Sequence, residues 1–416
     1  MFFFYQIIVT FILILSPFVI IYRIKKNKED KIRFIEKFSI PTLNKKKGKL
    51  IWIHGASVGE ILSIIPVIKY YEKKKLIKQI LITSSTLSSS KILNKFHFKK
   101  TVHQYYPIDH IFFVKKFLNY WKPSIAIFIE SEIWPCMFSK IKKNKIPLIL
   151  LNARLTKKTF KRWMNISFFA KEIFNKITIA YPQNLETKNF LKKIKTKKII
   201  HIGNLKFAEN AEENLDIINK KLKSELYKYK IWVASSTHKN EEIFCANAHK
   251  KLKRKFKNLI TIIIPRHVHR ANEIAAKMKK LDLKVAYHSS NLKTLKNVDI
   301  YIVDTFGETK LFHKISSSVF LGGSIIERGG QNPLEAARLG AKILHGPNID
   351  NFKDVYKLLK ILNISKKINT PSQLASSIVF KKKRNTGNKI KYIGKNILKK
   401  TINELDNLIN NEFKKT

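Results

Sequence analysis

The 416-residue chain has little cysteine and few acidic side chains. Its two cysteines, Cys136 and Cys245, lie far apart and outside any Cys-x-x-Cys or Cys/His cluster, which excludes a disulfide scaffold and a zinc ribbon. Lysine and arginine number 82 against 29 aspartates and glutamates, so the formal net charge is +53. Such a charge attracts nucleic acid, anionic lipid or phosphorylated substrates. The lysines are spread along the whole chain, however, and compositional bias of an A+T-rich coding sequence is the simpler explanation.

Several functional motifs are also missing. Neither GxGxxG nor GxxxxGK[ST] occurs, so hydride transfer and P-loop hydrolysis lack their motifs. No Ser/His/Asp ordering supports a hydrolase, and the absence of an RNP aromatic pair argues against a nucleic-acid partner. His267 and His269 have no third ligand at a matching spacing, so we expect neither a metal nor another cofactor.

Residues 1–22 form a nearly unbroken apolar run, interrupted by Gln6 and Pro17 among a few others. About 20 such residues span the hydrocarbon core of a bilayer. A signal peptide should have a basic start and a small-residue cleavage site, and the run has neither. Basic residues follow it instead, beginning with Arg23, and the positive-inside rule places the rest of the chain in the cytoplasm. The sequence predicts an uncleaved membrane anchor, with a buried core helix as the alternative.

After this run, short β-branched apolar segments alternate with longer helix-like segments, a pattern typical of βαβ units with a parallel sheet. The predicted strands are 50–53, 80–83, 124–129, 147–151, 177–180 and 199–202, then 231–234, 259–264, 300–303, 318–321 and 341–344. A polar stretch interrupts the rhythm near residue 209. We therefore expect an α/β protein with an anchor over 1–22, a Rossmann-like domain over 23–207, a linker over 208–228 and a second Rossmann-like domain with a helical tail over 229–416. Because ligands bind at the carboxyl ends of parallel strands, the active site should lie in the cleft between the domains.

Polar residues follow the predicted strands of the first domain. Glu60 comes where a helix begins and is suited to take a proton from a hydroxyl, although it can equally complement the helix dipole. Glu130 and Glu132 follow the third strand and can point the same way, or serve as solvated loop residues. Asn152 opens the turn after the next strand, and Lys206 near the linker is placed to meet a phosphate or carboxylate.

The second domain repeats this arrangement. The segments after its strands are Ser235-Ser236-Thr237-His238, Pro265-Arg266-His267, Asp304-Thr305-Phe306-Gly307-Glu308, Gly322-Gly323-Ser324 and Gly329-Gly330-Gln331-Asn332-Pro333-Leu334-Glu335. Arg266 can bind an anion in a bidentate way. The glycines precede a helix, so backbone amides can approach a phosphate closely, and Glu335 can accept ribose hydroxyls. These features predict a nucleotide site in the C-terminal half.

The segment 160–174 mixes aromatic and basic residues, among them Trp163, Phe168 and Arg162. Such a mixture suits an interfacial helix that sinks its aromatics among acyl chains. The alternative is an ordinary helix that packs against the first sheet.

Taken in order, the motifs resemble those of the 3-deoxy-D-manno-octulosonic acid (Kdo) transferases of lipid A biosynthesis. The motifs are WIHGASVGE, ESEIWP, NARL, GNLKF, STH, PRH, DTFGE and GGSIIERGGQNPLEAA. The resemblance implies an inverting, metal-independent GT-B glycosyltransferase that uses CMP-Kdo as donor and lipid IVA as acceptor. It also implies a single-pass protein of the inner membrane whose catalytic domains lie on the cytoplasmic side.

The resemblance also implies roles for single residues. Glu60 matches the general base, and Glu130 and Lys206 match positions that stabilise the transition state. The positions that match the CMP-binding segments are Pro265, Arg266, Phe306, Gly307, Glu308, Asn332, Pro333, Leu334 and Glu335.

Four positions depart from the family pattern, and they put acceptor choice and rate in question more than reaction class. The family usually has Met at Phe306, His at Gln331, Pro at Ala336 and Asp at Ala208. Two other functions stay open on the sequence alone. One is a membrane-associated GT-B transferase that uses a different sugar nucleotide, and the other is a basic membrane-binding or RNA-binding protein that has lost catalysis.

Overall fold

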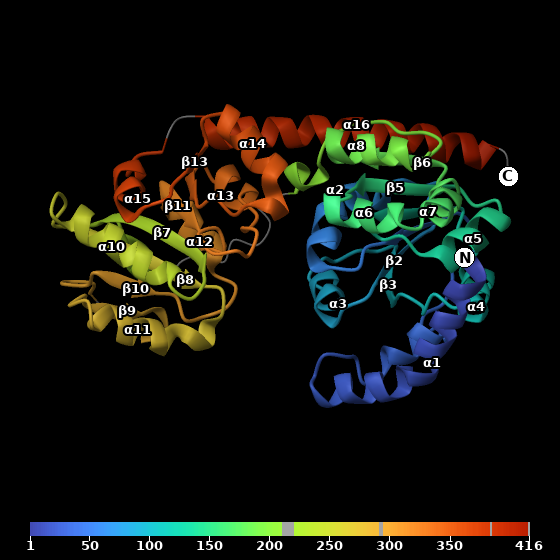
Figure 1. Ribbon diagram of the computed structural model, residues 1–416, viewed down its shortest axis with the longest axis horizontal. Helices are drawn as coiled ribbons and strands as arrows, with labels where there is room; N and C mark the ends of the chain where they lie inside the picture. Colours follow the sequence, from blue (N-terminus) through green and yellow to red (C-terminus); the bar gives the residue numbers. More distant parts are fainter. Residues whose placement is uncertain (210–219, 291–293, 383–384, 415–416) are drawn as a thin grey trace. The chain divides into compact units, whose positions relative to one another are not determined.

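The computed structural model describes residues 1–209, 220–290, 294–382 and 385–414. The chain divides into two compact units, Met1–Glu209 with Gly394–Thr416 and Asn210–Ile393 (Figure 1). Of the predicted linker, residues 210–219 lie outside the described residues. The predicted interdomain cleft stays a prediction.

The first unit contains a six-stranded parallel sheet in the order β3-β2-β1-β4-β5-β6. Its strands are β1 (Leu50–His54), β2 (Gln79–Ser84), β3 (Thr101–Tyr105), β4 (Ile125–Ile129), β5 (Leu148–Ala153) and β6 (Ile179–Pro182). The α-helices of its N-terminal segment are α1 (Phe2–Lys25), α2 (Val58–Glu72), α3 (Leu87–Leu93), α4 (Ile111–Trp121), α5 (Pro135–Lys143), α6 (Lys157–Met164), α7 (Ser167–Phe174) and α8 (Leu185–Lys193).

Two hydrophobic clusters cover the two faces of this sheet. Trp52 and Phe128 point into one cluster with side chains of α4, α5 and α7. Ile51 and Ile53, their neighbours along β1, point into the other with side chains of α2. Side chains alternate across a strand, so a strand buried on both faces must be apolar throughout. This is why the sequence predicts β1, β2, β4 and β5 from continuous apolar runs.

The second unit contains a seven-stranded parallel sheet in the order β13-β12-β11-β7-β8-β10-β9. Its strands are β7 (Lys230–Thr237), β8 (Leu259–Pro265), β9 (Val285–Tyr287), β10 (Ile300–Ile302), β11 (Ser318–Leu321), β12 (Lys342–His345) and β13 (Ser365–Lys367). Its helices are α9 (Lys220–Leu226), α10 (Glu241–Lys253), α11 (Ala271–Lys279), α12 (Thr309–Ile315), α13 (Leu334–Arg338), α14 (Lys353–Ile361), α15 (Pro371–Ser377) and the first part of α16 (Thr386–Lys414). Both units are thus Rossmann-like, as the sequence predicts.

The edges of the sheets differ from the sequence prediction. The edge strands β3, β9 and β13 are not predicted, because they are short or polar and bury less apolar surface. The predicted strand 199–202 is wrong, since only Ile199 pairs with the sheet, through a single parallel bridge to Ala180.

The C-terminal tail also differs from the prediction that placed it with the second domain. Residues 394–416 belong to the first unit. Leu405 and Ile409 of α16 are buried in the same cluster as α2, and Asp406 accepts hydrogen bonds from the hydroxyl groups of Tyr70 (2.5 Å) and Tyr71 (2.9 Å). The apolar stripe of α16 therefore completes one face of the first sheet.

Among the described residues, α1 is the helix that is long and apolar enough to cross a membrane by length and composition. The segment 160–174 forms two helices, α6 and α7, instead of one interfacial helix. Phe169 and Phe174 are buried in the core, which agrees with the alternative of a packed helix, whereas Phe168 is 78% exposed.

Candidate active site

Glu60 lies just beyond the carboxyl end of β1, in the first turn of α2. The Ser57 side chain caps this helix and accepts a hydrogen bond from the Glu60 amide, and its hydroxyl donates to Glu60 Oε1 at 3.0 Å. The Ala56 amide donates to Glu60 Oε2 at 2.7 Å. This arrangement resembles the capping box that a Ser-x-x-Glu sequence favours, except that Glu60 accepts from the amide of Ala56, the residue before the N-cap, and from the Ser57 hydroxyl. Glu60 therefore helps to hold the β1–α2 turn as well as presenting a carboxylate at the sheet edge.

Burial, and to a smaller extent the carboxylates of Glu132 and Glu130, raise the pKa of Glu60 to about 7, although the hydrogen bonds from Ser57 and Ala56 act in the opposite direction. A carboxylate with a pKa near neutrality is a far better proton acceptor than an ordinary surface glutamate, whose pKa is lower. The three acidic side chains after β1 and β4 thus act on one another electrostatically, as their common place at strand ends predicts.

Glu130 directly follows β4 and adopts a left-handed backbone conformation with φ of 56°. For a residue other than glycine this conformation costs about 1–3 kcal/mol and often occurs at functional sites. The buried Glu130 carboxylate forms an ion pair with Lys206 of η2 (Leu205–Ala208). The structure therefore brings together two residues that are 76 positions apart by their numbering, 206 minus 130.

The side chain of Asn152 holds η2 beside the end of β4. Asn152 also has a positive φ, 53°, and its side-chain oxygen accepts a hydrogen bond from the Leu205 amide at 3.0 Å. The side-chain oxygen of Asn204 accepts from the Lys206 amide at 2.9 Å. Asn152 of β5 and Asn204 thus position Lys206, which lies in η2 and not at the end of a strand as the sequence predicts.

Glu132 is held by two aromatic nitrogen groups that sequence reasoning did not connect with it. His54 Nε2 lies 3.2 Å from Glu132 Oε2, and the Trp134 indole donates to the same oxygen at 2.9 Å. The His54 ring is fully buried, and its Nδ1 lies 3.0 Å from the Thr83 hydroxyl. The Trp in ESEIWP and the His in WIHGASVGE are the only sequence signals of this arrangement. Unlike Glu130, Glu132 is therefore fixed through β1.

The candidate residues of the second unit follow β8 and β10. Pro265 ends β8 and is buried, whereas Arg266 is exposed while its amide donates to the Thr237 carbonyl at 3.0 Å. Phe306 is 86% exposed, and Gly307 adopts a φ of 94°. The side chains of Arg266 and Phe306 are therefore free of the core and available to a ligand.

Glu308 and Glu335 have histidine partners. His288 Nε2 lies 2.9 Å from Glu308 Oε1, and His313 Nδ1 lies 3.2 Å from Glu335 Oε1. Burial opposes ionisation of Glu335, but the hydrogen bond and charge of His313 leave its pKa below the ordinary value. Asn332 Oδ1 accepts from the Leu334 amide at 3.1 Å and so caps the turn before α13. Pro333 and Leu334 are buried, and α13 has five residues.

The glycine-rich loop differs from its predicted role. The amides of Gly323 (2.7 Å), Ser324 (3.1 Å) and Ile325 (3.0 Å) donate to the carboxylate of Glu241, at the start of α10. These amides therefore bind an internal carboxylate in place of the predicted phosphate. A Cβ on Gly322 would lie 2.4 Å from the Ser236 carbonyl oxygen, so the first glycine serves close packing of β7 and β11. Sequence reasoning missed Glu241, which no motif marks.

The sequence matches known proteins along most of its length. A family model described as 3-deoxy-D-manno-octulosonic-acid transferase (kdotransferase) matches residues 32–209. The 3-deoxy-D-manno-octulosonic acid transferase of Rickettsia felis is 36% identical over 354 residues, which are 84% of this chain and 75% of that protein. The corresponding Rickettsia bellii protein is 34% identical over 399 residues, 94% of this chain and 93% of that protein. The Haemophilus influenzae transferase is 29% identical over 74% of this chain and 73% of its own.

Solved structures resemble the fold at low sequence identity. A glycosyltransferase from Rickettsia africae superposes with a TM-score of 0.55 at 12% identity, covering 89% of this chain and 100% of that one. The S. aureus MnaA–UDP co-structure gives a TM-score of 0.55 at 13% identity, covering 87% and 97%. The two parallel-sheet units define a protein with the GT-B fold of glycosyltransferases. The chain belongs to the 3-deoxy-D-manno-octulosonic acid (Kdo) transferase family.

Proposed function

We propose that this protein transfers Kdo from CMP-Kdo to lipid IVA at the cytoplasmic face of the inner membrane. The observation that carries the proposal is the carboxylate of Glu60, raised in pKa to about 7 at the carboxyl edge of the first sheet, in a chain of the Kdo transferase family. Membrane attachment through α1 is part of the proposal, and a single pass is the form that the sequence predicts.

In the proposed reaction Glu60 takes the proton from the acceptor sugar hydroxyl. The hydroxyl oxygen forms the new bond to the anomeric carbon of Kdo, on the face opposite CMP, while the bond from that carbon to the phosphate oxygen breaks. The electron pair of the broken bond leaves with CMP, and the anomeric configuration is inverted. General-base catalysis of this kind contributes about 10²–10⁴-fold.

The Glu130–Lys206 ion pair is our candidate for stabilising the transition state. Its ammonium group is held by η2 and its carboxylate by the strained end of β4, so both charges are positioned before substrate binds. Charges fixed in advance stabilise developing charge more effectively than mobile ones.

The second unit is proposed to bind the CMP part of the donor. Arg266 is exposed at the end of β8 and suits a phosphate, and Glu335 suits ribose hydroxyls. The segments around Phe306–Glu308 and Asn332–Glu335 would complete this site. Because the charge on the leaving phosphate is assigned to Arg266, the proposal includes no metal ion.

The donor is tested by incubating the purified protein and lipid IVA with CMP-Kdo or with a panel of UDP-sugars. The proposal predicts release of CMP that depends on lipid IVA, and no release of UDP. Release of UDP alone would identify a GT-B transferase with another donor. Release of neither nucleotide, with retention of RNA in an electrophoretic shift at physiological salt, would support a binding protein without catalysis.

A further inference from the structure

The helix α1 has two different faces along its whole length. The residues buried or half-buried on one face recur at spacings of three and four and are Phe2, Tyr5, Gln6, Val9, Leu13, Ser16, Ile20, Arg23 and Ile24. The exposed large apolar residues on the remainder are Phe3, Phe4, Ile7, Ile8, Phe11, Ile12, Ile14, Leu15, Phe18, Val19, Ile21 and Tyr22. Spacings of three and four place residues on one side of a helix. The protein therefore covers one side of α1 and leaves an unbroken apolar surface on the other.

The first turns of α1 are attached to the first unit. The Tyr5 hydroxyl donates to Asp109 Oδ2 at 2.8 Å, and the Tyr5 ring lies 6.2 Å from that of Phe169, centroid to centroid. Asp109 is itself buried, and it also accepts the Cys136 amide at 2.9 Å and the Met137 amide at 2.8 Å. The start of α1 thus contacts a rigid point at the beginning of α5.

The other end of α1 is attached to the same unit. Glu29 is buried and pairs with Arg23 at 3.0 Å and with Lys37 at 2.5 Å. Lys37 belongs to η1 (Arg33–Phe38), whose Glu36 accepts the Tyr105 amide of β3 at 2.7 Å.

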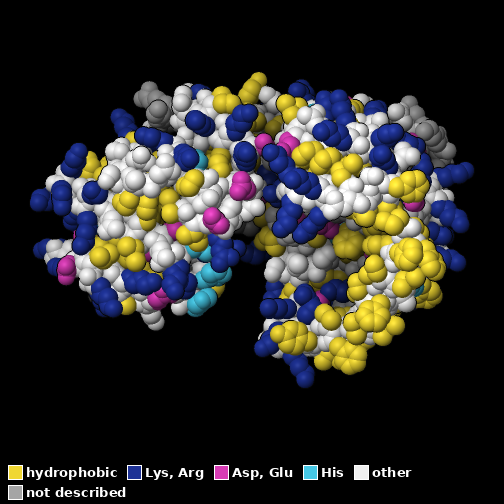
Figure 2. Space-filling model, viewed as in Figure 1, with side chains coloured by type: hydrophobic (Ala, Val, Ile, Leu, Met, Phe, Trp, Pro, Cys, Tyr) yellow, Lys and Arg dark blue, Asp and Glu magenta, His cyan; other side chains and the backbone are white. Residues whose placement is uncertain are grey.

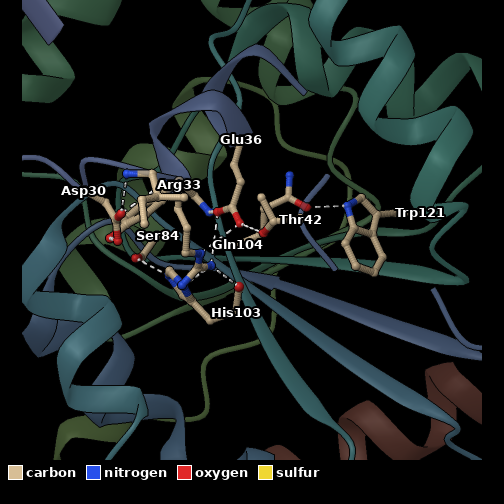
Figure 3. Close-up of polar contacts among 10 residues, drawn as sticks. Asp30, Arg33, Glu36, Thr42, Ser84, His103, Gln104 and Trp121 are labelled. Atoms are coloured by element: carbon tan, nitrogen blue, oxygen red, sulfur yellow. Dashed lines mark hydrogen bonds and ion pairs between the residues drawn. The ribbon is translucent and has the colours of Figure 1, made fainter. Parts of the chain in front are cut away.

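Figure 3 shows the polar contacts that connect η1 to the sheet. The Glu36 carboxylate faces Arg33 and Thr42, and the Arg33 guanidinium reaches His103 of β3. His103 Nε2 lies 2.8 Å from the hydroxyl of Ser84 on β2. This network lies only a few residues beyond the end of α1, so that end cannot move away from the sheet without breaking it.

Contacts at both ends are incompatible with a helix that crosses the bilayer. A helix of 24 residues is about 36 Å long, and a spanning helix places its two ends on opposite sides of a hydrocarbon core about 30 Å thick. The Tyr5 hydroxyl would then be separated from Asp109 by most of the bilayer. The observed contacts require both ends of α1 to stay on the side of the first unit.

We propose that α1 lies in the plane of the membrane surface, with its exposed apolar face among the acyl chains and both ends on the side of the first unit. The occupant of this face is a bilayer of anionic lipid. The exposed face carries no charged residue between Phe3 and Tyr22, whereas Arg23, Lys25 and Lys26 follow directly and can bind lipid phosphates.

Neighbouring elements extend this apolar surface. Figure 2 shows hydrophobic side chains gathered over α1 and the adjoining part of the first unit. Phe112 near the start of α4 and Phe168 of α7 are both exposed. In sequence, Phe112 lies three residues after Asp109 and Phe168 lies next to Phe169, and both Asp109 and Phe169 contact Tyr5. This placement rests on the membrane attachment in the proposed function but replaces the single pass that the sequence predicts. It concerns insertion alone, so it can fail while Kdo transfer holds.

The depth of three residues in the bilayer tests the proposal. Phe4, Phe11 and Phe18 are 65%, 64% and 73% exposed and follow one another at intervals of seven, on one side of the helix. Each is replaced in the full-length protein by cysteine (Phe4→Cys, Phe11→Cys, Phe18→Cys) and labelled with a fluorophore, because Cys136 and Cys245 are buried. Quenching by lipids brominated at different depths is then measured in phosphatidylethanolamine/phosphatidylglycerol vesicles.

The proposal predicts similar, shallow depths at all three positions, roughly 5–10 Å below the headgroups. A spanning helix would place position 11 near the bilayer centre, with positions 4 and 18 about 10 Å away along the helix on either side. That gradient would overturn the proposal, as would the absence of quenching at all three positions.

A matched pair of variants tests the contact at the start of the helix. Tyr5→Phe removes the hydroxyl that donates to buried Asp109, whereas Tyr22→Phe removes an exposed hydroxyl on the other face. In vesicles, Tyr5→Phe should lower the unfolding midpoint by roughly 2–8 °C, since the buried Asp109 carboxyl group loses one of its hydrogen-bond donors. Tyr22→Phe should leave it unchanged. Equal midpoints for both variants would contradict attachment of Tyr5 to the first unit.

Discussion

At the scale of single residues, Glu60 has a structural and a chemical role that one substitution can separate. Glutamine at the third helical position also forms a capping box, so Glu60→Gln keeps the turn while removing the base. We expect Glu60→Gln to lower turnover with CMP-Kdo and lipid IVA by about 10²–10⁴-fold and to leave the unfolding midpoint and CMP affinity close to those of the unaltered protein. A CMP-release assay, thermal unfolding and binding calorimetry with CMP measure these three quantities.

The matched control is Glu60→Ala, which removes the base and the side-chain partner of the Ala56 amide together. It should lose activity to the same extent and also lower the unfolding midpoint. Near-normal turnover of Glu60→Gln would remove Glu60 from the role of general base.

Glu132 should set the pH at which Glu60 works. The ionised Glu132 raises the pKa of Glu60, and only ionised Glu60 accepts a proton, so activity should rise as the pH passes upward through about 7. Glu132→Gln removes one of these charges and should shift the rising limb of kcat/KM to lower pH by about one unit or less. A pH–rate profile from pH 5 to 9 checks this.

Glu172→Gln is the control for that experiment, because it removes a surface carboxylate of α7 that pairs with Lys176. Its profile should coincide with that of the unaltered protein. An upward shift in Glu132→Gln, or an equal shift in both variants, would contradict the electrostatic coupling.

At the scale of secondary-structure elements, α16 supports η2 and thereby Lys206. A Cβ on Gly394 would lie 2.0 Å from the carbonyl oxygen of Phe207, the residue after Lys206. We expect Gly394→Ala to lower the free energy of unfolding by about 1–3 kcal/mol, because backbone must move to relieve the overlap. It should also lower kcat through displacement of Lys206. Chemical denaturation and a CMP-release assay measure the two effects.

Lys395→Ala serves as the control, since Lys395 is exposed on the next position of the same helix. It should change neither quantity appreciably. If Gly394→Ala were as stable and active as this control, close packing of α16 on η2 would not position Lys206.

Elements differ in how far the sequence predicts them. The strands β1 and β4 are predictable because both of their faces are buried, which requires continuous apolar residues. The edge strand β3 is not, because its residues include Thr101, His103 and Gln104. The place of α16 in the first unit is likewise hidden, since an apolar helical stripe indicates burial without naming the surface that it covers.

At the scale of the whole molecule, the candidate site was predictable where a motif ends a strand and not where distant segments meet. Glu60, Glu130 and Lys206 stand directly at strand ends or in the GNLKF motif, and the resemblance assigns their roles. The partnership of His54 with Glu132, and the binding of loop amides by Glu241, depend on tertiary contacts between separate segments. Such contacts leave no spacing pattern in one sequence.

Mass spectrometry of lipid IVA after incubation with the purified full-length protein and CMP-Kdo tests the central claim most directly. We expect lipid IVA to gain the mass of one or more Kdo residues and CMP to be released in equal amount. The Glu60→Gln protein should give almost no product over the same time. Lipid IVA that keeps its mass while the protein is folded and binds CMP would contradict Kdo transfer by this protein.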